Sequence, residues 1–147
     1  RIGHVAAMLH IMKLAVGVTD VAHLGALQAA RLQAGAGLRH RTRNFPRRAA
    51  EVTDGGSMYW VIAGAMVVRQ RITDIVEDQY EDGSRCAAIL LDPVLVPVAG
   101  RRTKPFQGWR YLTAADAPAD LGAGAPAGGV DELPAALRQE LRALGLL

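Results

Sequence analysis

The sequence predicts a single α+β domain built on a curved, mostly antiparallel sheet with flanking helices. Three observations support this fold class. The chain has 147 residues, which fits one domain. Short strand-like runs follow one another through tight turns in the middle of the sequence, as in an antiparallel meander. Helical patterns come before and after these runs, so the helices are expected at the margins of the sheet.

The first expected strand is residues 9–16, an apolar run that only Lys13 interrupts. A helix follows, because the side chain of Thr19 or Asp20 can accept a hydrogen bond from a free backbone N–H group at its start. Gly35 or Gly37 is expected to end it. Its apolar stripe consists of Val21, Leu24, Leu27 and Leu32.

Residues 39–43 alternate Arg, His, Arg, Thr, Arg. In an extended chain the three arginines share one face, and His40 and Thr42 lie on the other. Pro46 favours the start of a short helix, about residues 46–53, because proline is tolerated in the first helical turn. The Asp-Gly-Gly sequence at 54–56 ends this helix.

The middle of the chain predicts a meander. Residues 57–62 form a strand with Met58, Trp60 and Ile62 on one face and Tyr59 and Val61 on the other. Ala-Gly at 63–64 and Asp-Gly at 82–83 are turn dipeptides. The further expected strands are residues 66–76, 85–91, 94–98 and 109–111.

The chain divides into a core domain at 8–112, a flexible connector at 113–130 rich in Ala, Gly and Pro, and a C-terminal amphipathic helix at 131–147 with a leucine stripe. Residues 1–7 are expected to lie upstream of a natural start at Met8. The whole layout resembles PUA-like folds, including the ASCH group, many of which bind RNA or modified bases. That resemblance implies a sheet that curls into a small pseudo-barrel.

A closer resemblance rests on sequence blocks. These are MLHIMKLAVGV, TRNFPRRAAEVTDGGSMYWVIAG, RQRI, LLDPVLV, PFQGWRYL and APADL, which together span most of residues 8–121. They resemble an alphaproteobacterial family of about this length, the domain of unknown function 1489. The resemblance implies a complete bacterial protein and supplies no activity.

The positive charge is concentrated in the first part of the chain. Residues 1–60 hold eight Lys and Arg against three Asp and Glu, whereas residues 113–147 hold two against five. Arginine forks bind phosphate oxygens, and exposed aromatic rings stack on bases. The arginines expected to hold phosphate are Arg39, Arg41, Arg43, Arg47, Arg48, Arg69, Arg71, Arg101, Arg102 and Arg110. Trp109 and Tyr111 are the expected stacking residues.

Other classes of function fit poorly. No apolar run is long enough for a transmembrane helix, and the single Cys86 excludes an internal disulfide and suits a reducing compartment. Ser57 has no G-x-S-x-G context, and all four histidines precede it, which disfavours a serine hydrolase. No histidine and cysteine pair has a metal-binding spacing. No cofactor and no metal are therefore expected.

Three functions remain open. The first is a small cytoplasmic module that binds RNA. The second is a binding protein or enzyme for a small phosphorylated or nucleotide-like ligand. The third is a protein–protein adaptor or homodimer that uses the C-terminal helix. The arginines also fit a plain solvated surface in a chain rich in Ala, Gly and Arg. The sequence favours RNA binding without catalysis.

Overall fold

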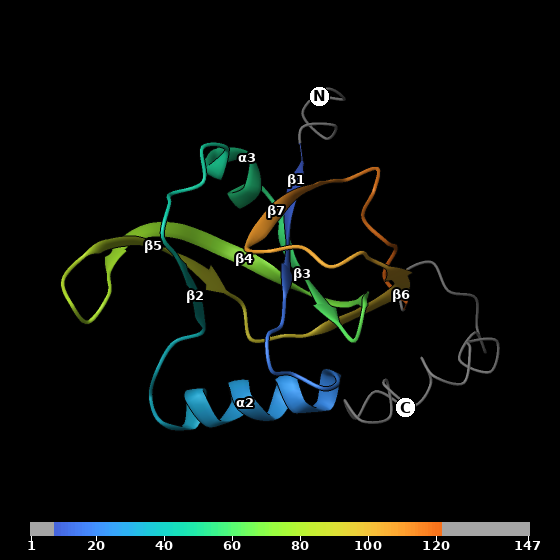
Figure 1. The fold of residues 1–147 in the computed structure, drawn as a ribbon, viewed down its shortest axis with the longest axis horizontal. Helices are drawn as coiled ribbons and strands as arrows, with labels where there is room; N and C mark the ends of the chain where they lie inside the picture. Colours follow the sequence, from blue (N-terminus) through green and yellow to red (C-terminus); the bar gives the residue numbers. More distant parts are fainter. Residues whose placement is uncertain (1–7, 122–147) are drawn as a thin grey trace.

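The computed structural model describes residues 8–121 (Figure 1). Two helices and seven strands make up this region, in the order β1 (Leu9–Leu14), α2 (Val21–Gln33), β2 (Arg39–Thr42), α3 (Ala49–Thr53), β3 (Ser57–Ile62), β4 (Ala65–Gln79), β5 (Arg85–Leu91), β6 (Val96–Arg102) and β7 (Trp109–Thr113). No helix among these residues is both long enough and apolar enough for a membrane span. The predicted C-terminal helix at 131–147 lies outside the described residues, as do residues 1–7.

The strands form one mixed sheet in the order β2-β5-β4-β3-β1-β7, and β6 pairs with β4 outside this path. β1 and β3 are parallel, and the other pairs are antiparallel. The predicted α+β class with a mostly antiparallel sheet is therefore confirmed. The predicted pseudo-barrel is not supported, because the sheet is open: β2 and β7 are its two edges, and no ladder joins them in the described part of the chain.

β4 is the longest strand, and it is shared by two parts of the sheet. Its first half lies between β3 and β6, where Arg69 is opposite both Tyr59 and Val96. Its second half pairs with β5, which starts from Ile72 opposite Leu91. Irregular pairing next to Ile72 marks the transition between the halves. Such irregularities increase strand twist, so β4 twists between its two halves.

Both faces of the central strands are buried. Met58, Trp60 and Ile62 on β3 belong to a large core, which also contains residues of α2 and α3. Tyr59 and Val61 belong to a smaller core on the opposite face. This split confirms the predicted alternation along β3. The helices α3 and α2 lie near opposite ends of the sheet (Figure 1).

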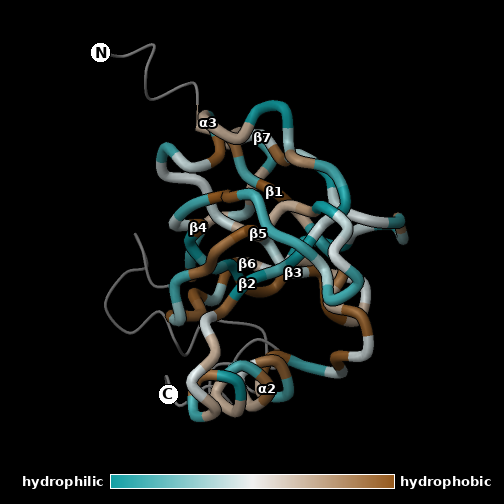
Figure 2. The backbone as a smooth tube through the Cα atoms, turned by 90° about the vertical axis from the view of Figure 1, so that its left-hand side faces the viewer, coloured by the Kyte–Doolittle hydropathy of each residue, from teal (hydrophilic) through white to brown (hydrophobic). Residues whose placement is uncertain are grey.

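The helix α2 begins as predicted, because the Asp20 carboxylate accepts a hydrogen bond from the His23 N–H at 2.8 Å. Gly35, with a φ of 83°, follows its end. The apolar stripe is shorter than predicted: Leu24 is buried, but Leu27 and Leu32 are 46% and 44% exposed. Figure 2 shows α2 at one end of the molecule with hydrophobic and hydrophilic residues mixed along it. Only the first half of α2 is therefore packed into the core.

Several boundaries differ from the predicted ones. The helix α3 is a single turn, because residues 46–48 form a turn before it, with the Pro46 carbonyl accepting from the Ala49 N–H. β4 extends further at its end, and β6 begins and ends later than predicted. Residues 119–121, within the expected connector, bond to β6 through Ala99 N–H to the Ala119 carbonyl and Leu121 N–H to the Pro97 carbonyl.

Candidate functional site

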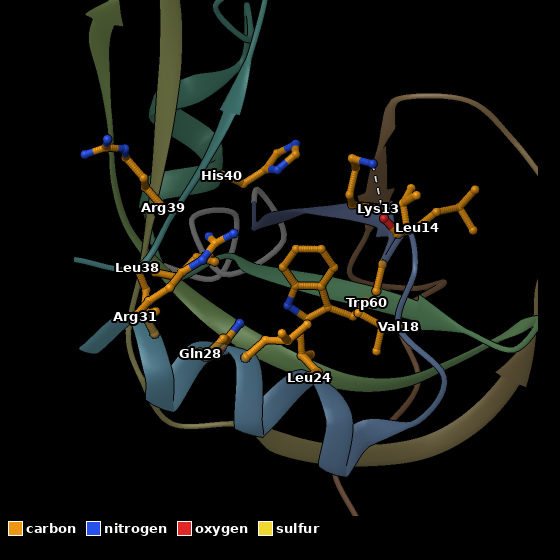
Figure 3. Close-up of a pocket in the computed structure, with 14 residues that line it drawn as sticks. Lys13, Leu14, Val18, Leu24, Gln28, Arg31, Leu38, Arg39, His40 and Trp60 are labelled. Carbon is orange, nitrogen blue, oxygen red and sulfur yellow. Dashed lines mark hydrogen bonds between the residues drawn. The ribbon is translucent and has the colours of Figure 1, made fainter. Parts of the chain in front are cut away.

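A cavity of about 250 Å³ opens between α2, the end of β1 and the start of β2, and we call it the α2 pocket (Figure 3). It exists because α2 crosses the open sheet near one end and packs tightly only through its first half. Leu24 and Val18 form part of the apolar wall, and Trp60 of β3 lies above α2 in this view (Figure 3). The pocket thus combines apolar walls with an aromatic ring.

Trp60 is held in place by a buried amide. Its indole N–H donates to the side-chain oxygen of Gln70 at 2.8 Å. Gln70 is itself paired with Gln28 of α2, through two hydrogen bonds of 2.9 and 2.7 Å. The ring orientation and the position of α2 are therefore fixed by the same group.

Three cationic side chains line the α2 pocket: Lys13, Arg31 and Arg39. None of its lining residues is an aspartate or a glutamate. Lys13 pairs with Trp60 in the β1–β3 ladder, which puts its side chain on the inner face of β1. Its ammonium group donates to the Leu14 carbonyl at 3.1 Å, and burial lowers the pKa of Lys13.

His40 completes the polar lining. Its ring lies edge-on to Trp60, with the ring centroids 6.3 Å apart. Burial, together with the nearby charges of Lys13 and Arg31, lowers the pKa of His40 from 6.5 to about 4. His40 is therefore neutral at physiological pH and presents one donor and one acceptor nitrogen.

A second hollow of about 410 Å³ adjoins the pocket, because Arg31, Arg39 and His40 line both spaces and Arg41 lines the second. Arg39 and Arg41 are held from outside by Asp78, at 3.6 and 3.2 Å. Arg41 also pairs with Glu81 at 3.1 Å. The mouth of the pocket thus contains arginines in fixed positions whose charge is partly balanced.

A separate basic groove of about 350 Å³ lies between β6 and β7, and we call it the β6–β7 groove. Its cationic lining residues are Arg101, Arg102, Lys104 and Arg110. Asp116 is the one acid among its lining residues, and its carbonyl accepts from Arg101 at 2.5 Å. Arg110 lies over the ring of Phe106, 5.5 Å from its centroid. The basic residues of segment 101–111 therefore all line one groove.

The remaining predicted arginines do not join either site. Arg48 forms a two-pronged pair with Glu51, at 2.8 and 2.7 Å. Arg69 forms a similar pair with Asp120, at 2.7 and 2.6 Å, which attaches the segment after β7 to β4. Exposed positions elsewhere are occupied by Arg43, Arg47 and Arg71.

Trp109 connects the two edges of the open sheet, and Tyr111 connects β7 to the start of α3. The Trp109 indole N–H donates to the Thr42 hydroxyl of β2 at 3.0 Å. The Tyr111 hydroxyl accepts from the Arg48 backbone N–H at 2.9 Å, and the Arg48 guanidinium lies 5.6 Å from the centre of the tyrosine ring. Both rings are half-buried, so these residues have a structural role in addition to any stacking role.

Ser57 occupies a buried polar cluster and is 1% exposed. Its hydroxyl accepts from Arg69 at 2.9 Å, and its backbone N–H donates to Nδ1 of His10 at 3.0 Å. Burial lowers the pKa of His10, and the charge of Arg69 adds to this effect. Because His10 contacts the backbone of Ser57, the arrangement does not activate the hydroxyl.

Sequence reasoning missed Lys13, Arg31, His40 and Trp60 as a group. One signal was present, since Lys13 is the single charge within an apolar strand. His40 was expected on the face of β2 opposite the arginines, and this face turns out to be the inner one.

Among known families, the one described as "Protein of unknown function (DUF1489)" matches residues 11–147. The chain belongs to this family. The match begins within β1 and covers every later element to β7, so the residues that line the α2 pocket and the β6–β7 groove all lie within the DUF1489 region. No curated protein and no solved structure matches the chain. The function of this DUF1489 protein therefore has to be argued from its sites.

Proposed function

We propose that this DUF1489 protein binds a small phosphorylated or nucleotide-like anion in the α2 pocket. One observation supports the proposal above all. Lys13, Arg31, Arg39 and the neutral His40 line a single pocket whose walls contain no carboxylate. A cluster of cations attracts an anion, and the apolar surroundings strengthen that attraction. Asp78 lies outside the pocket and balances only part of the charge of Arg39.

The size of the site favours a small ligand. The pocket alone, at about 250 Å³, is slightly below the roughly 300–1,000 Å³ typical of ligand sites. The adjoining hollow provides further space beside Arg39 and Arg41. A ligand ring or sugar would occupy the inner part near Trp60, and its phosphate would lie at the mouth, where arginine forks can bind oxygens in pairs.

Titration of mononucleotides and sugar phosphates, followed by calorimetry, tests the proposal. Arg31→Ala should weaken binding by about tenfold or more, since a hydrogen bond to a charged group contributes roughly 1.5–3 kcal/mol. Arg47→Ala is the matched control, because Arg47 is exposed and lines neither site. Saturable binding that is equally affected by both variants, or no binding of any compound, would reject the α2 pocket as the site.

RNA binding is the second candidate, and the β6–β7 groove favours it. Four cations surround this groove against one acid. Single-stranded RNA should then bind more tightly as its length increases, and its affinity should fall steeply with salt. Fluorescence anisotropy with labelled RNA measures both effects. Arg101→Ala with Arg102→Ala should weaken RNA binding, whereas Arg31→Ala should not. Affinity that is independent of RNA length and salt would reject this candidate.

Two further expectations belong to the proposal. A cytoplasmic location is supported by the free, buried Cys86, because free thiols persist in reducing compartments. The adaptor hypothesis concerns residues 131–147, outside the described part of the chain. Deleting residues 130–147 and testing for loss of self-association or of partner capture addresses it.

A further inference from the structure

We infer that Lys13 is a nucleophilic amine that forms an imine with an anionic aldehyde or ketone bound in the α2 pocket. This inference rests on the proposed function and names the chemical class of the ligand. A lysine acts this way when it is desolvated or lies next to other cations, because both conditions favour its neutral form.

The first condition holds in part at Lys13. The side chain is half-buried on the inner face of β1, opposite Trp60. Arg31 and Arg39 line the same pocket, which has no acidic lining residue. Burial lowers the pKa of Lys13, so a larger fraction of the amine is unprotonated than in an exposed lysine.

Lys13 is less buried than the other residues on the inner face of β1. Its neighbours on the inner face of β1 are Leu9 and Ile11, which are 2% and 0% exposed. The hydrogen bond that holds its amine goes to the Leu14 carbonyl, next to it in the chain, and involves no carboxylate. An ammonium group that is partly desolvated and has no carboxylate partner is held less strongly in its charged form. The amine is therefore available to a ligand in the pocket.

The chemistry is balanced without an oxidant or reductant. The neutral Nζ of Lys13 attacks the carbonyl carbon, forming a C–N bond while the C=O π electrons move to oxygen. A proton passes from nitrogen to that oxygen, and loss of water leaves the C=N bond of the imine. Arg31 would hold the anionic group of the ligand. His40, neutral in the same pocket, is the titratable group available to transfer the proton.

The chain offers an internal control, since its only two lysines are Lys13 and Lys104. Lys104 is exposed and lines the β6–β7 groove beside Arg101 and Arg102. It therefore also lies where anions gather. A phosphorylated aldehyde that merely follows positive charge would modify Lys104 at least as fast as Lys13.

The test uses pyridoxal 5′-phosphate as the aldehyde and cyanoborohydride to trap the imine, with peptide mass spectrometry to locate the adduct. Lys13 should be modified about tenfold faster than Lys104 or more, by analogy with other desolvated lysines. Lys13→Arg should abolish the fast modification while preserving a positive charge. Lys104→Arg should leave it unchanged.

A second measurement separates this inference from the proposed function. Pyridoxine 5′-phosphate has the phosphate and the ring but no aldehyde, and its binding is followed by calorimetry and by protection of Lys13. If it binds and Lys13 is modified no faster than Lys104, the nucleophilic role is overturned and the anion site stands. If it does not bind and Lys13 is not modified preferentially, both are overturned. Fast, protectable modification of Lys13 supports both.

Discussion

Gln70 is the residue on which the geometry of the α2 pocket depends most. It is completely buried on β4. Its oxygen accepts from Trp60 and from Gln28, and its nitrogen donates to Gln28 and to the Asp92 carbonyl at 3.1 Å. One amide thereby connects α2, β3, β4 and the segment between β5 and β6. All of its hydrogen-bonding capacity is used.

Replacing this amide should be costly. Gln70→Leu leaves the Trp60 N–H, the Gln28 amide and the Asp92 carbonyl without their partner. We expect the free energy of unfolding to fall by about 2–4 kcal/mol, since each buried unsatisfied group costs roughly 1–3 kcal/mol. Urea denaturation measures the change. Gln79→Leu, at an exposed position of the same strand, should change stability little. Equal effects of the two substitutions would contradict this role of Gln70.

His40 should make the protein sensitive to acid. Its pKa is lowered from 6.5 to about 4 in the folded state, so the unfolded chain binds more protons between these two values. Stability contributed by neutral His40 is therefore fully present above about pH 6.5 and is lost as the pH falls towards 4. The shift corresponds to roughly 3 kcal/mol.

Denaturation of the wild type and of His40→Gln at several pH values measures this contribution. The stability difference between the two proteins should change in favour of the variant as the pH decreases from 6.5 to 4. The contributions of other titrating groups to stability are the same in both proteins, so they cancel in this difference. A difference that is constant across that range would show that His40 is not held neutral.

At the level of elements, the junction from α3 to β3 depends on a glycine. A Cβ atom at Gly56 would collide with the backbone carbonyl oxygens of Leu9 and Val52. The absence of a side chain lets α3 pack directly against the start of β1. Gly37, between α2 and β2, has open space around it and no positive φ.

These two glycines give a matched pair of substitutions. Gly56→Ala should destabilise the fold by about 1–3 kcal/mol or more, because the clash is with backbone that cannot move aside. Gly37→Ala should be neutral or slightly stabilising, since it restricts the unfolded chain. Thermal unfolding of both variants checks the comparison. A larger loss for Gly37→Ala would contradict the close approach at Gly56.

The elements themselves were largely predictable, because local patterns specify them. The alternation along β3, the Asp20 cap and the Asp82-Gly83 turn all appear in the structure. The end of β6 was not predictable, since residues 99–102 have no strand-like pattern and pair with β4 through tertiary context. Leu27 and Leu32 fit a helical stripe but remain exposed, because only the first half of α2 packs into the core.

At the level of the whole molecule, side chains connect the edges that the backbone leaves apart. The hydrogen bond between Trp109 and Thr42 joins β7 to β2. Thr42→Val keeps the shape of this side chain and removes the acceptor. We expect faster amide hydrogen exchange in β2 and β7, with exchange in β3 unchanged.

Hydrogen exchange followed by mass spectrometry measures this effect peptide by peptide. Thr73→Val is a suitable control, because Thr73 is exposed and its hydroxyl bonds to the Leu90 carbonyl away from the open side. Uniform exchange changes across the sheet, or none in β2 and β7, would show that the contact does not hold the edges together.

The candidate site was the least predictable part, because its residues come together only in the complete fold. Lys13, Arg31 and His40 belong to three different elements. Only the curvature of the sheet and the position of α2 bring them together. The clustered arginines at 39–48 were conspicuous in sequence, yet two of them are paired with acidic groups. Arg41 pairs with Glu81, which is distant in the sequence, and Arg48 pairs with Glu51, three residues later.

The position of β1 affects how the chain folds during its synthesis. β1 lies between β3 and β7, and Leu9 is paired with Thr113. On the ribosome, β1 emerges before every other described strand but gains its second neighbour only after β7 emerges. Until then one edge of β1, with its apolar side chains, is open to pairing with other chains. A nascent DUF1489 chain should therefore depend on chaperones until synthesis has passed residue 113.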